Sequence, residues 1–529
     1  MIRIVLSERD FDYEIQALVN SFFPGERSRI YIWGEDIVDE KDSELKNLWI
    51  FIDLARANIT IRIQSGHLPW YTGQTAVSGT DGWHKKEGKK AHPYRSYYKN
   101  ELKKLLFTLL RDLPKEYLMS SGGYRRRIPV WGTMTGVRPT KIVMHQLLAG
   151  ASREQVRREL QETYLCSQEK TELGLEIATK EVALLQKIHY EQGYSLYISI
   201  PFCPTTCLYC SFPSYPWQQF SHLAERYLQA LKTEIHAMAD AMGDRTLSSV
   251  YIGGGTPTTL SASQLRELIL HVRSCYPVSE ACEFTVEAGR PDSITREKLE
   301  VLRELGVERI SVNPQTMQQR TLELIGRRHT VQDTVATFHL ARELGFQNIN
   351  MDLIIGLPGE TVDDFGDTLQ QIRALDPDSL TIHSLVIKRA SRLRSVLEEQ
   401  AAAVQISLEE LERGRGEQLE QMLLLGEQFA RESGYEPYYM YRQKNSAGHA
   451  GSTGQENIGF ARPGRECLYN VLIMEEKQTI VAVGAGASTK LYHEKLGQVS
   501  RVENVKSVTD YIDRVDEMIS RKYQLLQEN

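Results

Sequence analysis

The sequence has 529 residues, enough for about three domains of ~150 residues each and for a full-sized hydrophobic core. Hydrophobic residues make up 41% and charged residues 25%, which excludes a disordered chain and a collagen-like chain. The 63 basic and 69 acidic residues give a net charge of -6, so no overall positive field favours nucleic acid or anionic lipid as a partner.

Acidic residues occupy the amino terminus, MIRIVLSERDFDYEIQ, where a signal peptide has its apolar region. No run in the sequence approaches the ~18 consecutive apolar residues that a spanning helix needs. We therefore expect a cytoplasmic protein without a membrane partner.

Residues 1–190 are predicted to form an α+β domain of unknown role. The segment 47–65 (NLWIFIDLARANITIRIQS) is rich in β-branched and apolar residues and predicts paired strands. A stripe at helical spacing follows, formed by Leu102, Leu105, Leu106, Leu109 and Leu110. Further helical patterns run from the motif WGTMTGVRPTK (131–141) to about residue 192.

Residues 191–389 alternate short β-rich runs with longer amphipathic segments. The six predicted strands begin at Ser195 (SLYISI), Ser249 (SVYIGG), Glu283 (EFTVEA), Arg309 (RISVN), Asn348 (NINMDLI) and Ser379 (SLTIHSL). Strand and helix in alternation predict a parallel sheet with crossover helices, and six units predict an incomplete (β/α)6 barrel. Functional groups in such barrels lie at the carboxyl ends of the strands.

Residues 390–529 are predicted to form a carboxy-terminal α+β domain that covers the substrate. A long helical pattern (407–433) precedes the segments GYEPYYMYRQKN and NVLIMEEKQTIVAVGAGAS. The fold class is therefore α/β, a partial barrel with an α+β domain on each side.

Three of the seven cysteines, Cys203, Cys207 and Cys210, form C-x3-C-x2-C directly after the first barrel strand. Three thiolates bind three irons of a [4Fe-4S] cluster, and the fourth iron stays free to chelate the amino and carboxylate groups of a methionine moiety. A zinc site prefers four ligands in paired CxxC spacing, and three structural cysteines are the third alternative. The spacing favours the iron-sulfur cluster. The other four cysteines are interpreted as core or surface thiols.

The segments PFCPTTCLYCSF (201–212) and YIGGGTPTTL (251–260) together resemble the radical S-adenosylmethionine (SAM) family. More closely, the chain resembles the oxygen-independent coproporphyrinogen III oxidase family with its heme-chaperone relatives. The further segments that carry this resemblance are FTVEAGRPDSIT, RISVNPQT, IGRRHT and MDLIIGLPGET.

The resemblance implies a [4Fe-4S] cluster and SAM as cofactors. It implies a SAM site lined by Tyr197, Gly254, Gly255, Thr256, Glu287, Gln315, Arg327 and Asp352, with Tyr209 and Val386 nearby. Carboxylates at strand ends can accept hydrogen bonds from an amine or from ribose, and arginine can pair with a carboxylate. Outside this constellation, surface ion pairs would explain the same charged residues equally well.

The family reaction converts coproporphyrinogen III to protoporphyrinogen IX. A 5'-deoxyadenosyl radical takes hydrogen from a propionate, which then loses carbon dioxide and an electron. The resemblance implies an electron donor such as flavodoxin or ferredoxin. The candidate cations for the substrate carboxylates are Lys388, Arg389, Arg442 and Lys444, with solvent exposure as the alternative. His383 is interpreted as a core histidine rather than a proton-transfer group. No catalytic side chain is assigned.

Two departures leave a second function open, that of a heme-binding chaperone that delivers heme. Phe212 stands where the best-known dehydrogenases have a further cysteine, as in the chaperone branch, but the tail segment ECLYNVLIMEE (466–476) lacks the His-Asn signature of that branch. The missing signature favours the enzyme. A third interpretation, radical modification of RNA, is disfavoured because the net charge is negative and the basic patches 85–90 and 125–127 are short.

Overall fold

The structure is a computed structural model that describes residues 1–35, 47–55, 57–78, 93–188, 190–243, 245–386, 393–403, 408–443, 455–494 and 497–527. The chain divides into two compact units. Unit 1 comprises Met1–Glu176, Ile406–Gly416 and Arg442–Gln455, and unit 2 comprises Ile177–Gln405, Glu417–Tyr441 and Glu456–Asn529. The domain boundaries at residues 190 and 389 stay predictions.

Unit 1 contains a five-stranded sheet in the order β2-β1-β3-β4-β5. Strand β1 is parallel to β2 and β3, whereas β3, β4 and β5 form an antiparallel meander. The strands are β1 (Ile2–Leu6), β2 (Ser28–Ile32), β3 (Leu48–Leu54), β4 (Asn58–Ser65) and β5 (Tyr71–Ala76). Strands β3 and β4 confirm the paired strands predicted for 47–65. Their buried and less buried residues alternate because successive side chains point to opposite faces.

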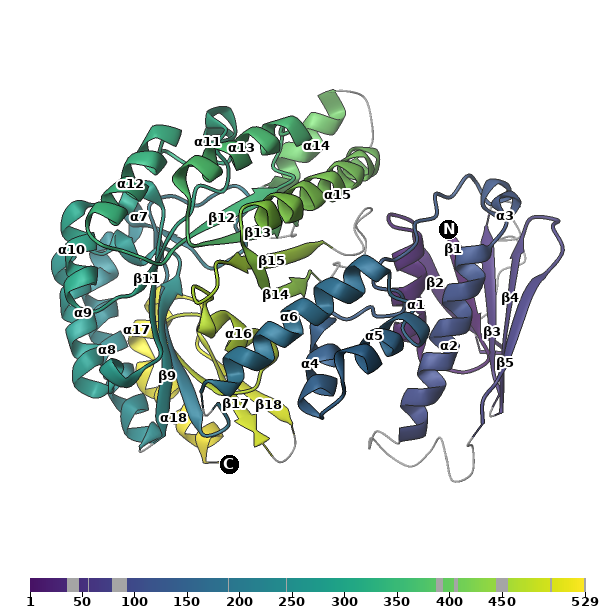
Figure 1. Cartoon of the computed structure of the whole chain (residues 1–529), viewed down its shortest axis with the longest axis horizontal. Coiled ribbons are helices and arrows are strands. Elements are labelled where there is room, and N and C mark those ends of the chain that lie inside the picture. Colours follow the sequence, from purple (N-terminus) through teal and green to yellow (C-terminus); the bar gives the residue numbers. More distant parts are fainter. Residues whose placement is uncertain are drawn as a thin grey trace. The chain divides into compact units, whose positions relative to one another are not determined.

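Helices α1 and α2 cover one face of this sheet (Figure 1). The predicted leucine stripe lies on α2, where Leu102, Leu106 and Leu110 are fully buried in the core. The helices that begin in unit 1 are α1 (Asp12–Phe22), α2 (Pro93–Asp112), α3 (Lys115–Ser120), α4 (Thr140–Leu148), α5 (Arg153–Glu162) and α6 (Gln168–Gln186).

Unit 2 is built on an eleven-stranded sheet in the order β14-β15-β13-β12-β11-β10-β9-β6-β16-β17-β18. Its six central strands are parallel and coincide with the six predicted strands. They are β6 (Gly193–Ile200), β9 (Thr246–Gly254), β10 (Glu283–Gly289), β11 (Arg309–Val312), β12 (Ile349–Ile355) and β13 (Ser379–Ser384). Within the described residues the sheet keeps two edges, β14 and β18, which confirms an incomplete barrel.

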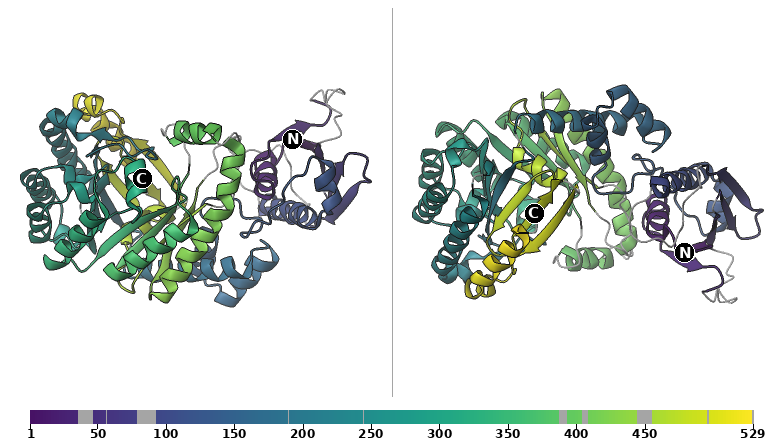
Figure 2. Two further views of the ribbon diagram at one scale, coloured as in Figure 1. Left: turned by 90° about the horizontal axis from the view of Figure 1, so that it is seen from above. Right: turned by 90° about the horizontal axis from the view of Figure 1, so that it is seen from below.

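The crossover helices line the outer side of the barrel strands (Figures 1 and 2). They are α8 (Ala224–Met242), α9 (Ala262–Cys275), α10 (Arg296–Glu304), α12 (Val331–Glu343) and α13 (Val362–Leu375), with a short α11 (Gln319–Leu324) before α12. Helices α9, α12 and α13 each begin with a capping box, whose N-cap residues are Ser261, Thr330 and Thr361. These caps satisfy backbone donors at the helix start and so fix where each strand-helix connection ends.

The tail adds strands to both sides of the six parallel strands. Strand β15 pairs antiparallel with β13, and β16 pairs parallel with β6. The tail elements are α14 (Leu393–Ala403), α15 (Leu408–Glu432), β14 (Glu436–Arg442), β15 (Glu456–Ala461), α16 (Leu468–Glu475), β16 (Thr479–Val483), β17 (Ser488–His493), β18 (Gln498–Glu503), α17 (Val508–Asp513) and α18 (Val515–Leu526). Helix α15 confirms the pattern at 407–433. Across the described residues, no helix has the length and apolar character that crossing a membrane requires.

A buried ion pair fastens α18 to the barrel. Lys522 Nζ lies 2.5 Å from Glu234 Oε1 on α8, and neither side chain is accessible to solvent. The Glu234 carboxylate also accepts hydrogen bonds from Gly484 N, Asn504 Nδ2 and Tyr511 Oη. Burial of the charges is tolerated because the carboxylate is paired and fully hydrogen-bonded.

We expect Lys522→Met to lower the free energy of unfolding by about 3–5 kcal/mol, because it leaves the Glu234 carboxylate buried without its counter-charge. Urea-induced unfolding followed by circular dichroism measures this loss. The matched control is Arg226→Gln, which breaks an exposed ion pair with Asp513, also between α8 and the carboxy-terminal helices. Its expected cost is below about 1 kcal/mol. Equal losses in the two variants would contradict the prediction.

Candidate functional site

The three cysteines lie on the loop that leaves the carboxyl end of β6. Residues Phe202–Cys203 form a two-residue strand, β7, that pairs with β8 (Tyr215–Pro216) and closes the base of the loop. Cys203 and Cys207 are buried and Cys210 is partly buried. Burial and the neighbouring Cys210 and Cys207 raise the pKa of Cys203 to about 11. The thiols therefore lie near one another at the predicted place.

Two donors point at the cysteine sulfurs. Thr256 Oγ1 lies 3.6 Å from Cys203 Sγ, and Arg290 Nη1 lies 3.7 Å from Cys207 Sγ. Arg290 also donates to the carbonyl of Thr205 and pairs with Asp292 at 2.6 Å, so it fastens the loop to the end of β10. Hydrogen bonds from such donors stabilise thiolate charge, which metal ligation requires. Arg290 was not predicted, although it lies within the segment FTVEAGRPDSIT.

These residues fit a [4Fe-4S] cluster. Three cysteines of one loop, two of them with hydrogen-bond donors at their sulfurs, provide the three thiolates that such a cluster takes on three of its irons.

The glycine segment at the end of β9 packs directly on the cysteine loop. Gly255 N donates to Ile200 O at 2.7 Å, and Thr256 N donates to Phe202 O at 2.7 Å. A Cβ on Gly255 would lie 2.6 Å from Phe202 O and 3.0 Å from Cys203 Sγ. Only glycine permits this approach. The glycine therefore allows the backbone after β9 to lie in close contact with the cysteine loop.

Glu287, on β10, is held by a tyrosine. Tyr251 Oη donates to Glu287 Oε1 at 2.5 Å. Burial raises the pKa of Glu287 to about 7. The tyrosine hydrogen bond opposes this increase, and the negative charge of Asp352 adds a smaller increase. A carboxyl group of this kind changes its protonation near neutral pH.

The pKa of Asp352, on β12, is shifted in the opposite direction. Asn313 Nδ2 and Asn350 Nδ2 each donate to its carboxylate at 2.7 Å. His383 Nε2 lies 3.8 Å from Asp352 Oδ1. Although burial opposes ionisation, the interactions with His383 and the neighbouring hydrogen bonds hold the pKa of Asp352 below its ordinary value. The site therefore contains one carboxylate and one carboxyl group that titrates.

Arg327 joins the cysteine loop to this network. Its Nη1 donates to Asn313 O at 2.5 Å, and its Nη2 lies 3.5 Å from Tyr209 Oη. Gln315 N donates to the carbonyl of Asp352 at 3.0 Å with φ +69°, a left-handed conformation that its backbone hydrogen bonds hold in place. Two buried polar atoms here, Gln315 Oε1 and Arg327 Nε, have no hydrogen-bond partner among the described residues. Such atoms are free to serve a bound ligand.

An aromatic stack lies beside these groups and was only partly predicted. The rings of Tyr197 and Tyr251 are 6.1 Å apart, and Tyr469 of α16 stacks on Tyr251 at 4.4 Å and on Tyr197 at 5.8 Å. Tyr469 comes from the tail, 218 positions after Tyr251, so no local pattern indicates the pairing. Tyr251 could have been predicted from the sequence, because it is the first residue of the segment YIGGGTP.

Five further candidates come from the part of the chain that follows β13. Val386 follows β13 and is partly buried, and the structure gives it no partner that bears on its role. Arg442 Nη1 donates to the carbonyls of Met134 and Gly136, so contacts within the WGTMTGVRPTK loop engage its guanidinium. Lys388, Arg389 and Lys444 lie outside the described residues.

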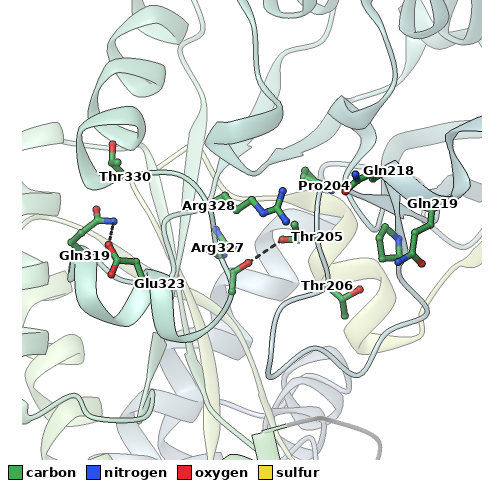
Figure 3. Close-up of a pocket in the computed structure, with 12 residues that line it drawn as sticks. Pro204, Thr205, Thr206, Gln218, Gln219, Gln319, Glu323, Arg327, Arg328 and Thr330 are labelled. Atoms are coloured by element: carbon green, nitrogen blue, oxygen red, sulfur yellow. Dashed lines mark hydrogen bonds between the residues drawn. The ribbon is translucent and has the colours of Figure 1, made fainter.

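A cavity of about 860 Å³ borders the cysteine loop (Figure 3). Thr205 and Thr206 of the loop line it together with Arg327 and Arg328, and Thr205 Oγ1 donates to Gly326 O at 3.0 Å. Gln218 and Gln219 of α7 (Trp217–Phe220) form another part of the wall in Figure 3.

We expect Glu287→Gln to gain stability over the wild type as the pH rises. The folded wild type retains a proton between the ordinary pKa of 4.5 and about 7, so its free energy of unfolding falls across this range. Because the glutamine does not titrate, the difference between the proteins should grow by about 2–3 kcal/mol. Urea unfolding at pH 4.5 and pH 8 measures it, with Glu280→Gln on an exposed turn as the control. Parallel pH profiles for Glu287→Gln and the wild type would refute the expectation.

Comparisons with known proteins place this site in a family. Residues 197–372 match the model of the radical SAM superfamily. Over 402 residues the chain is 40% identical to the oxygen-independent coproporphyrinogen-III oxidase-like protein HemZ of Bacillus subtilis (strain 168), covering 75% of this chain and 77% of that protein. It is 35% identical over 324 residues to the heme chaperone HemW of the same organism, covering 61% of this chain and 76% of that one.

Among solved structures, the coproporphyrinogen III oxidase HemN from Escherichia coli, described as a radical SAM enzyme, aligns with a TM-score of 0.47 and 26% identity. The alignment covers 64% of this chain and 73% of that one. The 40% identity to HemZ agrees with the cysteine loop and with the parallel barrel strands. The chain belongs to the oxygen-independent coproporphyrinogen-III oxidase-like family of the radical SAM superfamily, with a [4Fe-4S] cluster and SAM as its cofactors.

Proposed function

We propose that the protein catalyses the oxygen-independent oxidative decarboxylation of coproporphyrinogen III to protoporphyrinogen IX, a step of heme biosynthesis. The observation that carries the proposal is the 40% identity to the oxidase-like protein HemZ over 77% of its length. In the reaction each of two propionate side chains loses a hydrogen atom, carbon dioxide and one electron, and becomes a vinyl group.

The cysteine loop and its donors would hold the cluster. Cys203, Cys207 and Cys210 supply the three thiolates, while Thr256 and Arg290 stabilise their charge through hydrogen bonds. Together the bound cluster and SAM supply a 5'-deoxyadenosyl radical, which takes the hydrogen atom from the propionate.

The polar network beside the loop would position SAM. Asp352 offers an ionised carboxylate to an amine or to ribose hydroxyls, and Tyr251 fixes the direction of the Glu287 carboxyl group. The unsatisfied Arg327 Nε and Gln315 Oε1 add a buried donor and a buried acceptor. Tyr197, Tyr209, Gly254, Gly255, Thr256 and Val386 complete the proposed set.

The substrate and the electron donor are further parts of the proposal. Lys388, Arg389 and Lys444 are the cations that we expect at the substrate carboxylates, because four carboxylates require positive charge at the mouth of the pocket. An electron carrier such as flavodoxin or ferredoxin would reduce the cluster, and the reaction would take place in the cytoplasm.

A heme chaperone is the second candidate function. The 35% identity to HemW over 76% of its length and the Phe212 position favour it. The tail segment 466–476 lacks the His-Asn signature, which favours the enzyme.

The decisive experiment supplies anaerobic, cluster-reconstituted protein with dithionite, SAM and coproporphyrinogen III. We expect 5'-deoxyadenosine and protoporphyrinogen IX to form together, measured by chromatography and by porphyrin fluorescence after oxidation. In Cys207→Ala both products and most of the bound iron should be lost. In Cys275→Ser, which changes a partly buried cysteine on α9, both should remain.

The two functions give different outcomes in this assay. If 5'-deoxyadenosine forms without a vinyl product while the protein binds heme stoichiometrically, the decarboxylase proposal fails and the chaperone takes its place. If Cys275→Ser loses as much iron as Cys207→Ala, the assignment of the cluster ligands is wrong.

A further inference from the structure

The sheet of unit 1 has two chemically different faces. On β1, β3 and β4 alternate residues are aliphatic side chains buried in the core, for example Ile4 on β1, Ile50 on β3 and Ile61 on β4. Helices α1, α2 and α3 contribute to the same core, so they lie on this side. The intervening residues face the other way, and among them arginines and aromatic residues prevail.

The strand register gathers these residues across the sheet. In one row Arg3 lies between Arg29 on β2 and Trp49 on β3. In the next row Tyr31, Val5, Phe51 and Arg62 are successive neighbours on β2, β1, β3 and β4. Trp33 directly follows β2, and Trp70 directly precedes β5. We call these residues the aromatic-arginine face: Arg3, Arg29, Tyr31, Trp33, Trp49, Phe51, Arg62 and Trp70.

The five rings of this face form one connected cluster. Trp49 lies 6.5 Å from Tyr31 and 5.8 Å from Phe51, measured between ring centroids. Phe51 in turn lies 6.5 Å from Trp33 and 5.2 Å from Trp70. Edge-to-face and stacked contacts of this kind hold the rings in fixed orientations. The cluster is therefore ordered before any ligand arrives.

The guanidinium groups lie on the same rings. The Arg3 guanidinium carbon is 4.9 Å from the Trp49 centroid, that of Arg29 is 5.2 Å from Tyr31, and that of Arg62 is 5.5 Å from Trp70. Arg29 is exposed and Arg62 is half-buried, so their guanidiniums can meet an anion while they rest on a ring. Arg3 is buried and packs the rings from within. Asp53 is an exposed acid on the same face, at the carboxyl end of β3.

The outer rings of the face are accessible to solvent. Trp33 is 64% exposed and Trp70 is 44% exposed, whereas large aromatic residues are usually buried. Tyr31 is buried, and Trp49 and Phe51 are half-buried beneath these two rings. Two exposed tryptophans that rest on an ordered ring cluster and are rimmed by polar residues mark a binding surface.

The charge of this part of the chain is opposite to that of the rest. Residues 1–176 contain 27 Lys and Arg against 23 Asp and Glu, a net charge of +4. The remaining residues contain 36 against 46, a net charge of -10. Such an asymmetry favours an anionic partner for the amino-terminal region.

We propose that the aromatic-arginine face binds single-stranded nucleic acid. Unpaired bases stack on Trp33 and Trp70, and Arg29 and Arg62 pair with the phosphates that connect them. Stacking on a sheet surface requires bases whose faces are free, which excludes a duplex. Both required groups, flat rings and guanidiniums, alternate on this one surface.

The test uses the full-length protein and a fluorescein-labelled single-stranded 12-nucleotide oligouridylate, with binding followed by fluorescence anisotropy at 50 and 200 mM KCl. Trp33→Ala with Trp70→Ala should weaken binding at least tenfold, as expected for the loss of base stacking. Trp33→Phe with Trp70→Phe keeps a ring at both positions and should retain most of the affinity. Arg29→Gln with Arg62→Gln should weaken binding and flatten its salt dependence by about 1.4 in the log-log slope.

Matched controls lie off the face in the same unit. Tyr13→Ala removes a 66% exposed ring on α1, and Arg158→Gln removes an exposed arginine on α5. Neither substitution should change the affinity for the oligonucleotide. The proposal is overturned if the tryptophan variant binds like Tyr13→Ala, or if a 12-base-pair duplex binds as tightly as the single strand. It is also overturned if the oligonucleotide does not bind while coproporphyrin III binding depends on Trp33 and Trp70, because the occupant is then a tetrapyrrole.

Discussion

The constraint on which the site depends is the close approach of the β9 glycine segment to the cysteine loop. Two backbone hydrogen bonds, from Gly255 and Thr256 to the residues just before Cys203, leave no room for a side chain at position 255. They fix the base of the loop against a central strand of the sheet. As a result the thiols, the Thr256 hydroxyl and the carboxyl end of β9 keep one mutual arrangement, and the neighbouring strands add their polar groups around it.

The carboxyl groups on β10 and β12 differ in how readily they ionise. Asp352 accepts hydrogen bonds from two asparagines and lies near a histidine, which keep it ionised. Glu287 takes up a proton more readily because burial outweighs its tyrosine hydrogen bond, and the negative charge of Asp352 adds to the effect. Arg327 bridges Tyr209 of the cysteine loop and the carbonyl of Asn313, whose side chain donates to Asp352. Desolvation and specific partners, rather than residue type, decide the charge at each position.

The tail extends the sheet of the partial barrel on both sides. Its strands β15 and β16 pair with the first and last of the six parallel strands, and Tyr469 enters the tyrosine stack. The buried Lys522–Glu234 pair holds α18 against α8, and Gly484 N binds the same carboxylate. The tail thereby supports the strand that carries the cysteine loop.

The sequence by itself determined the six parallel strands, the cysteine loop and the family, because short β-rich runs, the amphipathic segments between them and the cysteine spacing are local signals. Tertiary structure alone decided the partners of Glu287, the place of Tyr469 and the role of Arg290, since these contacts join residues far apart in the chain. Net charge was an equally incomplete guide. Summed over the sequence it is negative, yet the register of the first sheet brings Arg3, Arg29 and Arg62 together with exposed tryptophans on one face, and only strand pairing could decide that.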